Sequence, residues 1–360
     1  MKYSKKEKLL LEKKNMKLIA LIGGPRAGID FLQSLFDRHP EILQFPGYFF
    51  FDDFWKKIEK QNTLKNIANT FISDYEKFFD SRVNLIERHH MLGKDKNGFF
   101  LVDKNKFFES FINLFRNKEI NKRNVLYNLH FAYSQALDED LQKKKIVILN
   151  VHQFFRLKVL DGINYEVIHT IRDPVAALCA QVKHWLNYED GKHVSPWQLH
   201  FFIDRAFNGL KTLTQLKTKI HVIQLELLHT QNTKVMKEMA KRFDISYNQS
   251  LTQSTYHGKL WWGDAVGGRD LNGVNPNFKN NIDYSFFYKK DILCLEKYLK
   301  AFMIKYNYPI SEKKLKFSII KILPLKIEIK VWKKMLSYRN TREILSFFKY
   351  WVKRVNLMKT

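Results

Sequence analysis

The residues best suited to anion chemistry lie between positions 23 and 28, where Gly23, Gly24 and Gly28 surround Arg26. An apolar run, Leu18–Ile22, precedes this turn, and apolar residues at helical spacing follow it. The order predicts a strand, a tight loop and the start of a helix. Exposed backbone N–H groups and a guanidinium group together bind the oxygens of phosphate or sulfate. No Gly-Lys-Ser/Thr follows, so an ordinary nucleoside-triphosphate loop is disfavoured.

A second basic turn is formed by Arg172, Asp173 and Pro174. The preceding apolar residues predict a strand, and the following residues predict a helix over 174–187. Asp173 suits the N-cap of that helix, and Pro174 suits its first position. Arg172 is then expected at the carboxyl end of a strand, which is where ligands bind in open α/β sheets.

These segments resemble the sulfotransferases that use 3′-phosphoadenosine-5′-phosphosulfate (PAPS). The family pattern G-x-P-R-S-G-T-T is matched by residues 23–30, and FLQSLFDRHPEI follows as in the family. Its R-D-P motif is matched at 172–174. The resemblance covers residues 17–45 and 146–190 well and residues 261–278 weakly, and the remainder only loosely.

The resemblance implies a fold, a co-substrate and a set of site residues. The fold is a three-layer α/β sandwich of P-loop NTPase type with a mostly parallel central sheet, and PAPS serves without a metal. The implied 5′-phosphosulfate loop comprises Gly24, Pro25, Arg26, Ala27, Gly28, Ile29 and Asp30. The implied 3′-phosphate site comprises Arg172 and Ala180, and the late loop offers Arg269 and Gly273 for nucleotide or acceptor.

This chain departs from the family pattern at its hydroxyl positions. Ala27, Ile29 and Asp30 replace Ser, Thr and Thr, and Ala180 replaces the serine of the second motif. A carboxylate at position 30 repels phosphate unless it points away, caps a backbone N–H or contacts a basic group.

Sulfuryl transfer needs a base for the acceptor hydroxyl and positive groups on the donor. The resemblance to sugar-directed members implies His152 as base, after a strand at 146–151, and Arg26 as the cationic group. The alternative role of His152 is a structural one at a strand end. Asp52 and Asp53 are rival bases, although helix capping is the commoner role of such residues.

The composition limits the classes of partner. A formal net charge of +26 favours anionic partners such as nucleotides, acidic glycans and anionic lipids. No nucleic-acid motif is present, so we expect no specific nucleic-acid partner. Two cysteines in 360 residues fit a reducing compartment, and no His or Cys spacing predicts a metal site.

The chain divides into three segments. We expect a basic tail at 1–16, an α/β domain at 17–310 with a mostly helical insert at 50–145, and a basic extension at 311–360. The extension has 14 Lys or Arg and three acidic residues, and 340–356 can form an amphipathic helix. This helix either lies on an anionic membrane or packs on the domain. Without a signal peptide or an apolar span, the chain is expected to be cytoplasmic, and peripheral attachment to a membrane stays open.

The periodicity of apolar residues predicts the remaining elements. Expected strands are 17–22, 146–151, 166–171 and 221–228, and expected helices are 28–38, 174–187, 196–217, 233–243 and 287–306. The many aromatic residues of the insert are expected to form core.

Two functions remain open from the sequence. The first is transfer of a sulfuryl group from PAPS to a hydroxyl of an acceptor, expected to be a carbohydrate or glycan. The alternative is a catalytically inactive relative that binds a nucleotide or an anionic glycan, and the missing hydroxyls at Ala27, Ile29 and Ala180 support it.

Overall fold

The computed structural model describes most of the chain. The described residues are 16–24, 26–61, 63–115, 118–187, 216–265, 270–271, 273–280, 285, 287–310, 323–337 and, near the C-terminus, 345, 348–349, 351–352 and 355–356. They divide into two compact units. The first contains the described residues up to Gly23, Gly28–Thr170 and Thr218–Phe278. The second contains those of Gly24–Ala27, Ile171–Lys217 and Lys279–Thr360.

A five-stranded sheet forms the centre of the first unit, with the order β2-β3-β1-β4-β5. Its strands are β1 (Lys17–Gly23), β2 (Ile42–Leu43), β3 (Ile146–His152), β4 (Tyr165–Ile171) and β5 (Ile220–Gln224). β1 pairs in parallel with both β3 and β4, and β2 pairs in parallel with β3. β1 and β3 are apolar and buried along nearly their whole length, as parallel strands covered on both faces must be.

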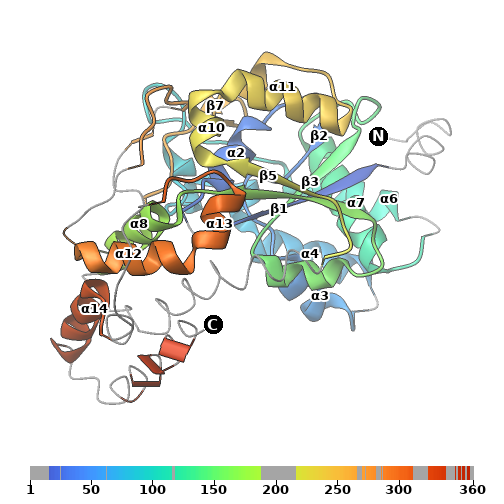
Figure 1. Ribbon diagram of the computed structural model, residues 1–360. Helices are drawn as coiled ribbons and strands as arrows, with labels where there is room; N and C mark the ends of the chain where they lie inside the picture. The colour runs from blue at the N-terminus through green and yellow to red at the C-terminus, as the bar shows by residue number, and fades with distance from the viewer. Residues whose placement is uncertain are drawn as a thin grey trace. The chain divides into compact units, whose positions relative to one another are not determined.

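Helices flank this sheet, and the predicted α/β class with a mostly parallel central sheet is confirmed. Figure 1 shows α2 (Ile29–Leu35), α10 (Leu225–Thr230) and α11 (Asn232–Phe243) on one side of the sheet, and α3 (Phe51–Ile58) and α4 (Leu64–Asp74) on the other. The first unit also contains α5 (Glu76–Phe79), α6 (Lys104–Leu114), α7 (Lys122–Ala136) and the hairpin of β6 (Thr255–Tyr256) and β7 (Lys259–Leu260). Short 3₁₀ segments are Ser81–Val83, His89–Met91, Phe154–Leu160 and Gln249–Thr252.

The second unit is helical in its described part. It contains α8 (Pro174–Asn187), α12 (Lys289–Tyr298), α13 (Lys300–Lys305) and α14 (Lys326–Ser337). α8 packs against α12, and Cys179 and Cys294 are buried in these two helices. Asp173 caps α8, because its Oδ1 accepts a hydrogen bond from Ala176 N at 2.8 Å, as the sequence predicted.

The insert between residues 50 and 145 is mostly helical, and its aromatic residues form a core, as predicted. Phe45, which is 2% exposed, lies at the centre of this core. Its ring lies within 5.3 Å of five other rings, namely those of Phe49, Phe71, Phe78, His130 and Tyr133. Such ring pairs add packing energy beyond the burial of area.

The structure corrects three of the predicted elements. The strand predicted over 221–228 ends at Gln224, and α10 begins at Leu225. The prediction was wrong there because a short apolar run fits a strand and a buried helix equally well. The helix predicted over 28–38 ends at Leu35, followed by a turn. The helix predicted over 287–306 is interrupted at Leu299.

Several other predictions fall outside the described residues. These include the helix at 196–217 and most of the basic extension, including the amphipathic helix at 340–356. α14 is the one continuous helix described within that extension. Among the residues described, no helix is both long and apolar enough to cross a bilayer.

Replacing Phe45 by alanine should lower the free energy of unfolding by about 3–5 kcal/mol, because a buried ring is lost from a packed cluster. Urea unfolding followed by circular dichroism measures the loss. The control is Phe99→Ala, because Phe99 is 38% exposed. That variant should lose less than about 1 kcal/mol. Equal losses in the two variants would show that Phe45 does not organise the core.

Candidate active site

Three segments of the chain leave the sheet at one edge. β1 ends at Gly23, β3 at His152 and β4 at Ile171. The registers pair Ile22 with His152 and Gly23 with Thr170, so the three strands end at the same level. The carboxyl edge of a parallel sheet is where α/β proteins bind ligands.

The first predicted motif forms a tight turn after β1. Ala27 N donates a hydrogen bond to Gly24 O at 3.2 Å, and Arg26 has a left-handed backbone, with φ of 57°. Glycine or asparagine normally occupies such a position in a turn. A left-handed arginine is a local conformational cost, of a kind that concentrates at functional sites.

The second predicted motif contacts the first. Arg172 Nη1 donates a hydrogen bond to the backbone carbonyl of Arg26 at 3.5 Å, and Arg172 Nε donates to Asn280 Oδ1 at 3.0 Å. Both arginine side chains are partly exposed. Two turns that are separated by more than a hundred residues in sequence thus lie together in the second unit.

Ala27, Gly28 and Ile29 offer a ligand backbone groups rather than polar side chains. Gly28 is the N-cap of α2, with φ of 77°, and a Cβ atom there would lie 2.3 Å from Leu225 Cδ1. Ile29 is 4% exposed and packs beneath Gly23, and Ala27 is 2% exposed. Ala27 and Ile29 are therefore part of the core.

The end of β3 brings a polar cluster together. The register shifts next to His152, and that residue also has a left-handed backbone, with φ of 62°. Asn150 Oδ1 accepts a hydrogen bond from His152 N at 3.0 Å, and Asn150 Nδ2 donates to Asp30 Oδ1 at 3.2 Å and to Gln33 Oε1 at 2.8 Å. His152 Nδ1 lies 3.9 Å from Asp30 Oδ1.

Asp30 therefore points toward the end of β3. Burial, followed by the nearby carboxylates of Glu87 and Asp264, raises the pKa of Asp30 to about 7, while Asn150 and Lys77 act in the opposite direction. Protonation near neutral pH removes much of the repulsion that an aspartate at this position would exert on an anion.

Lys77 and Tyr48 complete the surroundings of this cluster. Lys77 Nζ lies 3.2 Å from Glu87 Oε1 and 3.6 Å from the centre of the Tyr48 ring. The Tyr48 ring in turn lies 5.8 Å from the His152 ring. A polar and aromatic environment of this kind suits a group that exchanges protons.

The rival bases Asp52 and Asp53 lie in the first turn of α3. Both carboxylates bind Arg156, with Nη1 at 2.6 Å from Asp52 Oδ1 and 2.7 Å from Asp53 Oδ2. The hydrogen bond with Arg156 lowers the pKa of Asp53. This pairing makes Asp53 a poor proton acceptor.

The other predicted site residues lie in separate places. Ala180 is half-buried on α8, and Gly273, with φ of 62°, lies beside Ser254 in the first unit. Pro25 and Arg269 lie outside the described residues. Trp261 Nε1 donates to Glu87 O at 2.6 Å and Trp262 Nε1 to Gly93 O at 2.7 Å, so both tryptophans act as anchors.

Sequence reasoning missed Asn150, which joins Asp30, Gln33 and His152. A signal was present, because Asn150 is the single amide in the apolar run IVILNV. A buried amide inside a strand must find partners, and this need marks it as part of a polar cluster. Tyr48 and Lys77 gave no such signal, since only tertiary contacts bring them near His152.

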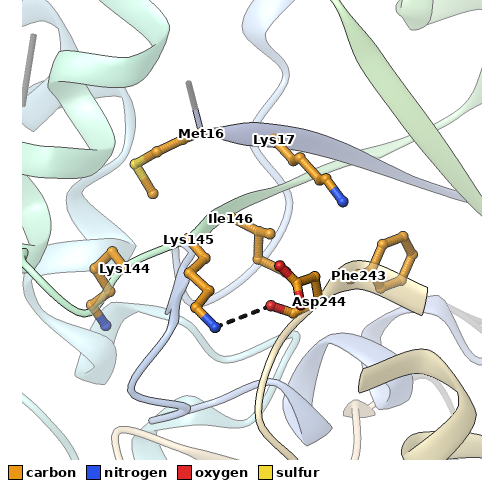
Figure 2. Close-up of a pocket in the computed structure, with 7 residues that line it drawn as sticks. All are labelled: Met16, Lys17, Lys144, Lys145, Ile146, Phe243 and Asp244. Carbon is orange, nitrogen blue, oxygen red and sulfur yellow. Dashed lines mark hydrogen bonds between the residues drawn. The ribbon is translucent and has the colours of Figure 1, made fainter. Parts of the chain in front are cut away.

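A hollow lies at the opposite edge of the sheet, where β1 and β3 begin (Figure 2). Three lysines line it, namely Lys17, Lys144 and Lys145. Lys144 Nζ is 2.8 Å from Glu139 Oε2 and Lys145 Nζ is 3.0 Å from Glu41 Oε1, so acids neutralise much of its charge. Within the part of the chain that is described, no group of three His, Cys, Asp or Glu residues is placed to hold a metal ion.

Comparisons with known proteins find similarity only among solved structures. No family model matches the chain, and no curated protein matches it significantly. The sulfotransferase domain from the curacin biosynthetic pathway is 15% identical, with a TM-score of 0.43 over 83% of this chain and 100% of that one. The sulfotransferase domain from the Synechococcus PCC 7002 olefin synthase is 11% identical, with a TM-score of 0.41 over 83% and 98%. At these values no residue role is transferred from those proteins to this chain.

The substitution Gly28→Ala should lower the free energy of unfolding by about 1–3 kcal/mol, because it strains a left-handed backbone and overlaps Leu225. Gly24→Ala is the matched control, since the nearest atom to a Cβ there is 3.9 Å away. It should change stability by less than about 0.5 kcal/mol. Equal effects in urea unfolding would contradict this account of the turn.

Asp30→Asn should stabilise the protein above neutral pH, because the raised pKa of Asp30 disfavours its ionised form in the folded chain. The penalty is absent below the ordinary pKa of 3.8 and grows as the pH rises to about 7. The variant should therefore gain on the order of 1–3 kcal/mol at about pH 8, and the gain should shrink toward about pH 4.

Asp53→Asn is the contrasting control, since Arg156 lowers the pKa of Asp53. This variant should lose stability at neutral pH, and the loss should diminish as the pH falls through the lowered pKa. Chemical unfolding of both variants across pH measures the two trends. If the two variants changed stability in the same direction at neutral pH, the environments assigned to Asp30 and Asp53 would be wrong.

Proposed function

We propose that this protein is a sulfotransferase that moves a sulfuryl group from PAPS to a hydroxyl group of an acceptor. The observation that carries the proposal is the hydrogen bond from Arg172 Nη1 to the Arg26 carbonyl. It joins the two sequence motifs that resemble the family's phosphate-binding segments. Two arginines on adjoining turns suit a donor with phosphate at both ends of its ribose.

The turn at Gly24–Ala27 holds the 5′-phosphosulfate in this proposal. A Cβ atom at Gly24 would meet nothing closer than 3.9 Å, so a ligand can approach the backbone there. Arg26 supplies positive charge where the leaving phosphate gains negative charge. Arg172 holds the 3′-phosphate in this proposal, because a guanidinium group donates paired hydrogen bonds to phosphate oxygens.

His152 takes the acceptor proton. Its Nδ1 faces Asp30, so Nε2 is the nitrogen that acts as base. The donor supplies a sulfuryl group on a phosphate leaving group. As the acceptor O–H proton passes to Nε2, the acceptor oxygen forms a bond to sulfur. The bond between sulfur and the phosphate oxygen breaks, and the phosphate retains the electron pair.

We propose a carbohydrate or glycan as the acceptor, on the resemblance of His152 to the base of sugar-directed sulfotransferases. We also propose a cytoplasmic location with peripheral contact to anionic membranes through the basic residues of 311–360. The 14 Lys or Arg residues against three acids in that extension support the second point.

Calorimetric titration with 3′-phosphoadenosine 5′-phosphate tests the donor site. The wild-type protein should bind in the micromolar range, and Arg26→Ala and Arg172→Ala should each weaken binding about tenfold or more. The loss of one charge-assisted contact accounts for this factor. A wild-type protein that does not bind the nucleotide would rule out the proposed function.

Arg123→Ala is the matched control for the loss of one positive charge, because Arg123 is exposed on α7 beside Tyr127. It should weaken binding by less than about twofold. Binding of the nucleotide with no sulfuryl transfer from PAPS to a panel of carbohydrates would instead support an inactive binding protein.

A further inference from the structure

The polar cluster at the end of β3 contains a carboxyl group that the proposed reaction has not yet used. Asp30 stands where the resembling family has a threonine, and its side chain is 23% exposed. Its Oδ1 contacts the amide of Asn150 and lies 3.9 Å from His152 Nδ1. A structural cap would bond to backbone N–H groups, whereas this carboxyl faces a side-chain amide and an imidazole.

We propose that Asp30 is a positioning residue that pairs with His152, shares one proton with it and holds its Nδ1 so that Nε2 faces the acceptor. The inference rests on the proposed function for its catalytic meaning, but the pairing itself is a property of the folded chain. Apo structures often show such contacts longer than they are in the working complex, so 3.9 Å is compatible with the role.

Asn150 fixes the geometry of the pair. One side-chain amide accepts a hydrogen bond from His152 N and donates to Asp30 Oδ1, so both members are tied to the end of the same strand. Gln33 restrains the amide from the other side and itself donates to the carbonyls of Phe45 and Gly47. These hydrogen bonds hold the Asp30 carboxyl and the His152 backbone at the end of β3 without a ligand.

The charges around the pair favour proton sharing. Glu87 and Asp264 act on the Asp30 carboxyl from two other segments, and Lys77 partly offsets them. Tyr48 faces the His152 ring, and Tyr256 Oη donates to the backbone carbonyl of Asp30 at 3.4 Å. Burial and these acids raise the pKa of Asp30 to about 7, which is the range in which an imidazole ordinarily titrates.

Proton NMR titration of the imidazole C–H signals tests the pair without any substrate. His152→Gln identifies the His152 signal among those of the 12 histidines. Asp30→Asn, whose Oδ1 can still accept the Asn150 bond, should lower the apparent pKa of His152 by about one unit. Asp37→Asn is the control, because Asp37 lies just beyond the same helix but binds Thr255 and Gly258. It should leave the His152 titration unchanged.

The reciprocal measurement keeps the proposal testable where Asp30→Asn does not fold. Removal of the imidazole in His152→Gln should shift the titration of the Asp30 carboxyl carbon by an equal amount, since coupling between two sites is mutual. The absence of a shift in both measurements would overturn the pair.

Activity separates this inference from the proposed function. If the chain transfers sulfuryl groups, Asp30→Asn should lower kcat and move the ascending limb of its pH profile by the shift seen in the titration. Asp30→Glu should restore part of kcat. A wild-type protein that shows the coupling but transfers nothing would overturn the function and leave the pair supported. Transfer by Asp30→Asn with an unchanged pH profile would overturn the catalytic role of the pair.

Discussion

The parallel pairing of β1 with β3 on one side and β4 on the other is the constraint on which the rest of this structure depends. It brings the chain out of the sheet at one edge after Gly23, His152 and Ile171. Parallel strands run in the same direction, so segments far apart in sequence must end as neighbours. Every residue to which we assign a chemical role lies at or next to the carboxyl end of one of these three strands.

Two residues at this edge have backbone conformations that are unfavourable for their side chains. Arg26 and His152 both have left-handed backbones, which side chains of this size rarely adopt. Hydrogen bonds stabilise both conformations, since Ala27 N donates to Gly24 O across one turn and His152 N donates to Asn150 Oδ1 at the end of β3. Conformations of this kind persist where the surrounding structure fixes them, and seven other described non-glycine residues of this chain also have a positive φ.

The residues at positions 27, 29 and 30 have two different roles in the structure. Ala27 and Ile29 join the core, so their segment keeps its backbone and loses polar side chains. Asp30 instead belongs to a partly buried polar cluster, in which burial and nearby acids raise its pKa. The same segment therefore has fewer polar side chains at the proposed phosphosulfate turn and an ionisable group next to His152. Comparison with the family pattern predicts the absence of hydroxyl groups at positions 27 and 29. It does not predict the raised pKa of Asp30, because Glu87 and Asp264 come from distant segments.

The sequence by itself determined the α/β class, the strands around the two motifs and the cap at Asp173, because these follow from local periodicity and turn chemistry. It did not separate strand from helix at Leu225, where a short apolar run allows both. Only the tertiary structure decided that Arg172 meets the Arg26 carbonyl, that Arg156 binds Asp52 and Asp53, and that Asn150 joins Asp30 to His152. These contacts join residues far apart in the chain, and long-range packing rather than local preference brings them within bonding distance.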